Sequence, residues 1–207
     1  MRVYLSAQPP AVMARPAKYP RETMLERAMD LFWTKGYEAT SVQDLLDGLD
    51  IHRGTLYDSF GDKHGLYMEV LAHYRNTIGK RLLAILAQPG SKKAIIHQVF
   101  DLLTGTLATA EGQRGCLLTN ATMELSLSDA AVATAVETSQ LNLTTAFQQT
   151  LTEAQLAGEI PVRTPAEVQA LAQYLVTNIQ GLRVQARTNC NLSALRQITK
   201  IVLSVLD

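Results

Sequence analysis

Apolar residues recur along most of the chain at the spacing of one face of an α-helix. Between Pro20 and Gly36 they occupy positions 24, 25, 28, 31 and 32, which follow the 3.6-residue repeat. Proline suits the first turn of a helix, and Lys35 followed by Gly36 supplies a cation and a cap at its end. The same pattern predicts two short helices, one behind Ser41 and one over 53–60, and a longer helix from 61 to about 88.

Capping signals divide the second half of the chain into five further helices. Three of them are expected over about 91–110, 116–127 and 128–157. Thr164 to Glu167 form a capping box with proline at the first helical position, and Asn191 caps a last helix that ends near 206. No segment of useful length alternates as a β-strand does. The sequence therefore predicts an all-α fold of about nine helices.

The composition favours a folded chain with a sizeable core. Of the 207 residues, 47% are hydrophobic and only 18% are charged, whereas disordered chains show the opposite balance. Nineteen basic and nineteen acidic residues cancel, so no overall positive charge attracts nucleic acid or an anionic membrane. Residues 1–75 carry nine Lys or Arg against ten Asp or Glu. Any contact with nucleic acid must therefore rest on a few well-placed cations.

The cysteines and the lack of a targeting signal favour a reducing cytoplasm. Cys116 and Cys190 lie far apart, which argues against a disulfide scaffold. The best apolar run, over 82–87, is six residues long, against the roughly 20 that span a bilayer. Residues 1–18 contain prolines and no continuous apolar stretch, which predicts a flexible N-terminal arm with Met13 as an alternative start. We expect a cytoplasmic protein with no membrane partner.

No pattern indicates an enzyme or a bound cofactor. The histidines are scattered, and the chain has neither an H-E-x-x-H nor a C-x-x-C motif for a metal. We find no base–nucleophile pair and no glycine loop of the kind that cradles phosphate. The expectation is a protein that is not an enzyme and holds no metal or cofactor.

The three short helices before residue 61 have the outline of a helix-turn-helix unit, whose third helix enters the major groove of DNA. The start of that helix carries a polar string, His52-Arg53-Gly54-Thr55, followed by Tyr57. Arginine can bond guanine or phosphate, glycine lets the backbone approach closely, and hydroxyls can donate to phosphate. Lys63 begins the next helix, where free amides also favour a phosphate. The alternative for these side chains is a solvated helix face.

Four short motifs lie in register within residues 20–67. They are MDLF at 29–32, G-Y-x-x-T-S at 36–41, R-G-T-L-Y-x-x-F at 53–60 and D-K at 62–63. Together they make this segment similar to the DNA-binding domain of the TetR family of bacterial transcriptional regulators. The resemblance covers about a quarter of the chain. One such motif alone is weak, but four in order over some forty residues are specific.

The resemblance implies a domain organisation and a set of contacts. Behind the arm at 1–18, it implies a helix-turn-helix DNA-binding domain over 19–66 and a regulatory ligand-binding and dimerisation domain over 67–207. It implies a homodimer that binds a double-stranded operator, and a small-molecule inducer bound by the C-terminal domain. The DNA-contacting positions that it implies are Thr40, Ser41, Arg53, Gly54, Thr55, Tyr57 and Lys63, to which the residue pattern adds His52.

The chain departs from the family pattern at four positions. Leu46 and Leu49 stand where the family usually has small residues, which would widen the spacing between the packed helices. Asp50 replaces a glycine, and aspartate tolerates the left-handed conformation, so we expect the turn to survive. His52 replaces serine or threonine and is a poor N-cap, so its imidazole faces solvent or reaches the DNA. These departures affect the operator sequence rather than the function.

An apolar surplus on the last two helices predicts the dimer interface. A terminal helix needs one apolar stripe for its own core, whereas the segment 192–206 has more than one. Paired with 168–182 it would form a four-helix bundle across a two-fold axis, the alternative being burial within one subunit. The predicted interface residues are Leu171, Leu175, Leu182, Leu195, Ile198, Ile201, Val202 and Val205.

A ligand pocket is predicted among the helices after residue 64, from residue type and rough position. Its candidate residues are Phe100, Cys116, Met123, Phe147, Tyr174 and Asn178. Cys116 follows Gly115 near a predicted helix start, with Arg114 close by, and both influences lower the pKa of a thiol. Three roles stay open for Cys116: core filler, pocket lining, or a sensor of oxidants and electrophiles.

Taken together, these features predict a ligand-responsive homodimeric transcriptional repressor. Its two recognition helices would lie ~34–36 Å apart, in successive major grooves. A ligand would favour a conformation with a different separation, with residues 62–88 as the lever. The alternative is a DNA-independent helical ligand-binding or scaffold protein, which the nearly neutral N-terminal segment favours.

Overall fold

The computed structural model describes residues 19–109, 112–188 and 191–207, and every regular element within them is helical. The predicted N-terminal arm with Met13, and Cys190, lie outside the described residues. No helix in these ranges is long and apolar enough to cross a membrane. In chain order the elements are α1 (Arg21–Lys35), α2 (Val42–Leu49), α3 (Arg53–Phe60), α4 (Lys63–Tyr74), η1 (Arg75–Gly79), α5 (Lys80–Leu86), α6 (Lys92–Leu107), η2 (Gly112–Arg114), α7 (Leu117–Leu125), α8 (Ala130–Leu156), α9 (Pro165–Ala186), α10 (Leu192–Leu203) and η3 (Ser204–Leu206).

The segments α4, η1 and α5 form one continuous helical run, so the described chain has about nine helices, as predicted. The expected uninterrupted helix differs at η1, which is a π-helical turn. The hydroxyl of Thr77 donates to the carbonyl of His73 at 2.8 Å, and such bonds compete with the regular helix ladder. Gly79, a weak helix former, ends the turn.

Side-chain caps begin the helices at the predicted positions. The hydroxyl of Ser41 accepts a hydrogen bond from Asp44 N–H at 3.0 Å, while the Asp44 carboxylate accepts one from Ser41 N–H at 2.8 Å. Thr164 and Glu167 form a second reciprocal capping box at the start of α9. The N-caps of α6, α8 and α10 are Ser91, Asp129 and Asn191.

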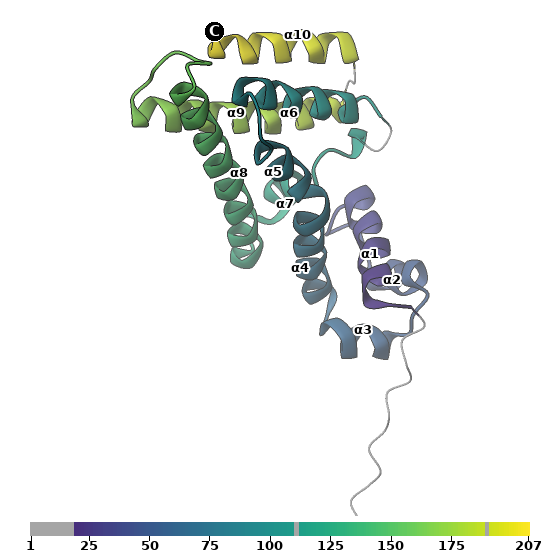
Figure 1. The fold of residues 1–207 in the computed structure, drawn as a ribbon. Helices are drawn as coiled ribbons and strands as arrows, with labels where there is room; N and C mark the ends of the chain where they lie inside the picture. The colour runs from purple at the N-terminus through teal and green to yellow at the C-terminus, as the bar shows by residue number, and fades with distance from the viewer. Residues whose placement is uncertain (1–18, 110–111, 189–190) are drawn as a thin grey trace, which may run out of the picture.

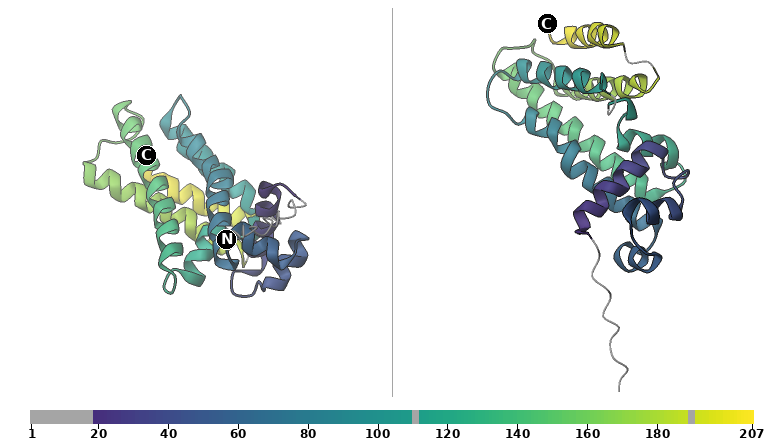
Figure 2. Two further views of the ribbon diagram at one scale, coloured as in Figure 1. Left: turned by 90° about the horizontal axis from the view of Figure 1, so that it is seen from below. Right: turned by 90° about the vertical axis from the view of Figure 1, so that its right-hand side faces the viewer.

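The helices form an elongated molecule in which α3 and α10 lie at opposite ends, as Figure 1 shows. The run from α4 to α5 leads from the first end toward the second. The two longest helices, α8 and α9, pack against each other. In the right-hand view of Figure 2, α10 forms a layer over α6 and α9, and it packs against both.

Two hydrophobic clusters hold the described chain together. One of them, which includes Phe100 and Phe147, gathers α5, α6, α8, α9 and α10. The other joins α1–α4 to α7 and the first turns of α8, and the rings of Phe32 and Tyr67 meet edge-to-face in it at 4.9 Å. Because this second cluster continues past residue 66, packing crosses the predicted domain boundary. The boundary itself stays a prediction from sequence.

We expect Leu56→Ala to lower the free energy of unfolding by about 2–5 kcal/mol, because Leu56 is 0% exposed in the core that anchors α3. Leu127→Ala is the matched control: this leucine is fully exposed, so the expected change stays within about 0.5 kcal/mol. Urea denaturation followed by circular dichroism measures both. Equal effects of the two substitutions would contradict the assigned core.

Candidate functional site

The turn between α2 and α3 gives the N-terminal unit its helix-turn-helix geometry. Asp50 ends α2 in the left-handed conformation, with φ 54° and ψ 50°, so aspartate preserves the turn as expected. His52 occupies the N-cap position of α3 without a side-chain cap bond, and its imidazole is exposed. The two leucines of α2 that depart from the family pattern fit the packing, since Leu49 is fully buried and Leu46 is half-buried.

The recognition edge of α3 is the set of polar residues on its outward side. On the inward side Leu56 and Phe60 are 0% and 6% exposed. The outward residues are His52, Arg53 and Gly54, which are exposed, Thr55, which is half-buried, and Tyr57, which is 45% exposed. Figure 1 places α3 at a free end of the molecule, so a partner can approach this edge without displacing another helix.

Arg53 and Gly54 leave room for a partner at the start of α3. The described part of the chain gives the Arg53 guanidinium neither a hydrogen bond nor an ion pair. No atom lies within 4 Å of the position that a Cβ would take on Gly54. An incoming surface can therefore approach the backbone there while the guanidinium remains free to bind it.

Three other predicted contact residues are already engaged within the chain. Thr40 is 0% exposed and donates its hydroxyl to the carbonyl of Gly36 at 2.6 Å, which corrects its assignment as a DNA-contacting side chain. Ser41 is exposed, although its hydroxyl belongs to the α2 capping box. Lys63 is half-buried, with its Nζ 4.2 Å from the centroid of the Tyr37 ring.

Ion pairs neutralise other cations of the N-terminal unit. Arg21 bonds the carboxylate of Glu69 at 2.5 Å, and Lys35 bonds that of Asp44 at 2.6 Å. The hydrogen bond from Lys35 is the main reason that the pKa of Asp44 lies well below its usual range. Arg53 is the only basic residue of α2 and α3, so the positive charge of the recognition edge depends on it.

Two polar contacts that the sequence did not predict join the N-terminal unit to later helices. The carboxylate of Glu124 in α7 accepts hydrogen bonds from the N–H groups of Tyr37 and Glu38, at 3.0 and 2.8 Å, in the turn before α2. His64 Nε2 lies 2.6 Å from Oδ2 of Asp129, the N-cap of α8. The paired residues are 65 to 87 positions apart, so no local motif could have marked them.

Most residues predicted for the dimer interface belong to the core of one subunit, which corrects that assignment. Leu175, Leu182, Leu195 and Val202 are at most 3% exposed. Leu171, Ile198 and Val205 are partly buried against the same cluster, and Ile201 remains 70% exposed. The reason is the position of α10, which packs over both α6 and α9. Apart from Ile201, the apolar residues of α10 that exceed a single stripe are therefore covered by helices of the same subunit.

The residues predicted to line a ligand pocket are not gathered around one cavity. Phe100 and Phe147 are fully buried with their ring centroids 6.5 Å apart. Met123 is 81% exposed and Tyr174 is 39% exposed, and the side-chain amide of Asn178 donates to the Tyr174 carbonyl. A cavity of about 270 Å³ lies instead where α1 meets η1, α5, α6 and α9. Residue type alone does not separate core aromatics from pocket aromatics.

Cys116 is buried at the N-cap of α7, beside Tyr74 of α4 and Arg183 of α9. Burial by itself raises the pKa of the Cys116 thiol. The positive charge of Arg183 and the hydrogen bonds with Tyr74 and Thr119 outweigh burial and hold that pKa below its ordinary value. Cys116 and Arg183 also line a hollow of about 40 Å³. The thiol is therefore core-packed, and its surroundings nevertheless hold its pKa below the ordinary value.

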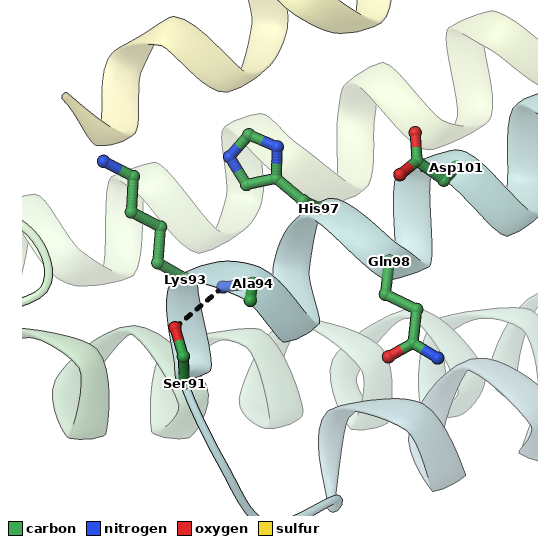
Figure 3. A pocket seen from close by; sticks show the side chains of 6 residues that line it. All are labelled: Ser91, Lys93, Ala94, His97, Gln98 and Asp101. Carbon is green, nitrogen blue, oxygen red and sulfur yellow. Dashed lines mark hydrogen bonds between the residues drawn. The ribbon is translucent and has the colours of Figure 1, made fainter.

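A further hollow lies on the outer side of α6, seen in Figure 3. Ser91, Lys93, Ala94, His97, Gln98 and Asp101 line it. The Ser91 hydroxyl accepts a hydrogen bond from Ala94 N–H, Glu159 accepts one from Lys93 N–H, and the Lys93 ammonium pairs with Asp207. Because Ser91 and Lys93 are already bonded within the chain, we assign the hollow no binding role.

Comparisons with known proteins find relatives for both halves of the chain. A model of the bacterial regulatory proteins of the tetR family matches residues 24–70, and a model of the tetracyclin repressor-like C-terminal domain matches residues 93–202. The chain is 30% identical to the HTH-type transcriptional repressor ComR of Escherichia coli over 190 residues, which are 91% of this chain and 90% of ComR. It is 31% identical to the uncharacterised HTH-type transcriptional regulator YezE of Bacillus subtilis over 195 residues, 94% of this chain and 100% of YezE.

A related protein with the same fold has been solved in complex with DNA. It is a cysteine mutant of the TetR family transcriptional regulator CifR complexed with a 26-base-pair double-strand operator. The match has a TM-score of 0.84 and 28% sequence identity, and it covers 93% of this chain and 100% of the CifR chain.

We expect the Cys116 thiol to titrate below the usual thiol range, and Arg183→Met to raise its pKa by removing the nearby positive charge. Thiolate absorbance against pH measures this in a Cys190→Ser background, with Arg196→Met as the control that leaves the midpoint unchanged. A midpoint that does not respond to Arg183→Met contradicts the assigned partner. Mass labelling of the native protein with iodoacetamide then separates a sensor thiol from a core filler, because only the sensor forms an adduct.

Proposed function

The chain belongs to the TetR family of bacterial regulatory proteins, which are DNA-binding transcriptional regulators and not enzymes, and we propose that it is a ligand-responsive homodimeric repressor. The single observation that carries this proposal is the recognition edge of α3, which faces solvent at a free end of the molecule. Repression is supported by the likeness to ComR, a repressor, and to CifR, which is complexed with operator DNA.

The chemistry of the recognition edge suits the major groove. Arg53 can form a bidentate pair with guanine or bond a phosphate, and the hydroxyls of Thr55 and Tyr57 can donate to phosphates. The open space at Gly54 lets the backbone approach the DNA. With one cation on α2 and α3, a single subunit has little electrostatic attraction for DNA. Specific binding therefore needs two subunits on two half-sites.

We infer that the dimer forms through α8 and α9 rather than through α9 and α10. Tyr174, Thr177, Gly181 and Val184 follow one another at helical spacing on the exposed side of α9, and none carries a charge. No atom lies within 4 Å of a Cβ built on Gly181, so a partner helix could approach closely there. On α8, Leu141 is 63% exposed. Such an uncharged apolar stripe suits the same stripe of a second copy.

The proposed response to a small-molecule ligand is supported by the cavity of about 270 Å³ beside α1 and η1. A ligand there changes DNA affinity only by the difference in its binding to the two conformations, typically ~1–3 kcal/mol. The alternative function is a DNA-independent ligand-binding or scaffold protein, which keeps the cavity but recognises no duplex. Selection from a random-sequence duplex pool at two salt concentrations separates the two, because only the repressor enriches a specific site.

We expect Arg53→Ala to weaken binding to the selected duplex by about 1–3 kcal/mol without changing the fold, because it removes the only cation of the recognition edge. Fluorescence anisotropy of the labelled duplex measures the affinity, and circular dichroism the fold. Arg196→Ala, an exposed arginine on α10, is the control and should bind as the parent does. Unchanged affinity of the Arg53 variant would rule out α3 as the recognition helix.

We expect Val184→Glu to convert the dimer to monomers, because it places a charge, and in the dimer a like pair of charges, on the apolar stripe of α9. Ile201→Glu changes an exposed apolar side chain of α10, the helix that the sequence placed in the interface, and should leave the dimer intact. Sedimentation velocity gives the oligomeric state of both. The reverse result, dissociation by Ile201→Glu alone, would restore the interface predicted from the sequence.

A further inference from the structure

The cavity where α1 meets the later helices has no assigned ligand. It holds about 270 Å³, less than the roughly 300–1,000 Å³ of pockets for drug-sized ligands. Apolar side chains from α1, η1, α5 and α6 form much of its wall: Met29, Trp33, Ile78, Leu82, Leu103 and Leu107. The wall therefore suits a small ligand with a mainly apolar body.

Positive charge dominates the polar part of this wall. Arg81, Arg114 and Arg183 line the cavity together with one carboxylate, Asp30. Asp30 pairs with Arg114 at 2.9 Å, whereas Arg81 and Arg183 form no ion pair with a carboxylate of the described residues. A ligand in the cavity thus meets two guanidinium groups that pair with no carboxylate of the described residues, although Arg183 also lies beside the Cys116 thiol. Guanidinium groups bind carboxylates in a two-bond geometry.

A residue that lines the same cavity has a buried hydrogen-bond donor without an acceptor. Trp33 is 9% exposed, and its indole Nε1 is buried without a hydrogen-bond partner among the described residues. Buried donors are nearly always bonded in folded proteins, so an unbonded one needs an explanation. An acceptor on a bound ligand supplies it.

We propose that this cavity binds a small organic acid, with one carboxylate on an aromatic or branched apolar body. The carboxylate pairs with Arg81 and Arg183, and the apolar body packs against the aliphatic wall. An oxygen of the ligand accepts the hydrogen bond of Trp33 Nε1. The proposal names the effector class of the repressor described above and rests on that function.

The contacts around the cavity give the ligand a direct route to α1. Arg114 pairs with Asp30, and its guanidinium carbon lies 4.2 Å from the centroid of the Trp33 ring, so one side chain holds two residues of α1. A ligand carboxylate competes with Asp30 for Arg114 and thereby loosens this hold. Because α1 packs against α2 and α4, its displacement moves the recognition edge of α3.

Trp33 is the only tryptophan of the chain, so its fluorescence reports binding in the cavity. Titration of the full-length protein with phenylacetate, cyclohexylacetate and 4-phenylbutanoate should give a saturable change in emission for at least one acid. The neutral amide of that acid should bind about tenfold more weakly or worse, because it cannot form the charge-assisted bonds. No saturable change for any of the three acids at ~1 mM, or equal binding of acid and amide, overturns the proposal.

Two substitutions that should change the affinity for the acid in opposite directions test the assigned residues. Arg81→Met, at an exposed position of α5, should weaken the acid about tenfold. Asp30→Asn should strengthen it several-fold, because it removes a competing carboxylate and frees Arg114. A merely structural role for Asp30 predicts no strengthening. Arg196→Met lies outside the cavity and should leave the affinity unchanged, and failure of both sign predictions overturns the site.

Operator binding is measured separately, so the two proposals fail in different ways. Anisotropy of the selected duplex, with and without the acid, reports DNA affinity, while Trp33 emission reports the acid. A protein that binds the duplex but shows no response of Trp33 overturns the organic-acid site and leaves the repressor standing. A protein that binds the acid and enriches no duplex overturns the repressor function.

Discussion

The burial of Leu56 and Phe60 fixes the rotation of α3 about its own axis, and the proposed function depends on this rotation. The two side chains lie four residues apart and anchor one side of a helix of eight residues. Each contributes about 1.5–3 kcal/mol by leaving water. Any rotation that exposed them would turn the opposite side of α3, which carries Asp58, toward the core, and burying an unpaired charge costs far more. The polar edge of α3 therefore faces outward as a consequence of the apolar side.

The N-terminal unit is not packed as an independent domain. Its core continues into α7 and the start of α8, and Glu124 bonds two backbone N–H groups in the turn before α2. The helix α7 thus has Cys116 at its beginning and Glu124 near its end, so one rigid element connects the buried thiol to the helix-turn-helix. Events in the later helices can reach α3 through this element and through α1, in addition to the run from α4 to α5.

The proposed acid site fits this arrangement because it lies at the junction rather than deep in the later helices. Its wall includes α1, which packs against α2 and α4, and the π-helical turn η1, which continues α4. A π-helical turn is often found at functional sites because one additional residue per turn can be gained or lost there. In the proposed complex the charge of the ligand would lie beside the ion pair between Arg114 and Asp30, which joins η2 to α1.

Local signals in the sequence determined the helices, their caps and the polar edge of α3. Ser41, Thr164 and Asn191 cap helices as predicted, and Asp129 caps α8 where a helix was expected to begin, because a capping bond forms between residues only two or three positions apart. Asp50 adopts the left-handed turn for an equally local reason. The motifs around Arg53 identified the family for the same reason, since they lie within one continuous stretch of chain.

Only the tertiary structure decided which apolar residues face the core and which groups from distant segments meet. The surplus on α10 could not be assigned from sequence, because periodicity marks an apolar face without saying whether another helix of the same subunit covers it. Thr40 was misassigned because its exposure depends on packing around the turn. Folding brings together residues that lie far apart in the chain, as in the pairs Glu124 with Tyr37, Arg114 with Asp30 and Cys116 with Arg183. A single sequence does not show which distant residues will be neighbours in space, so these contacts could not be predicted from it.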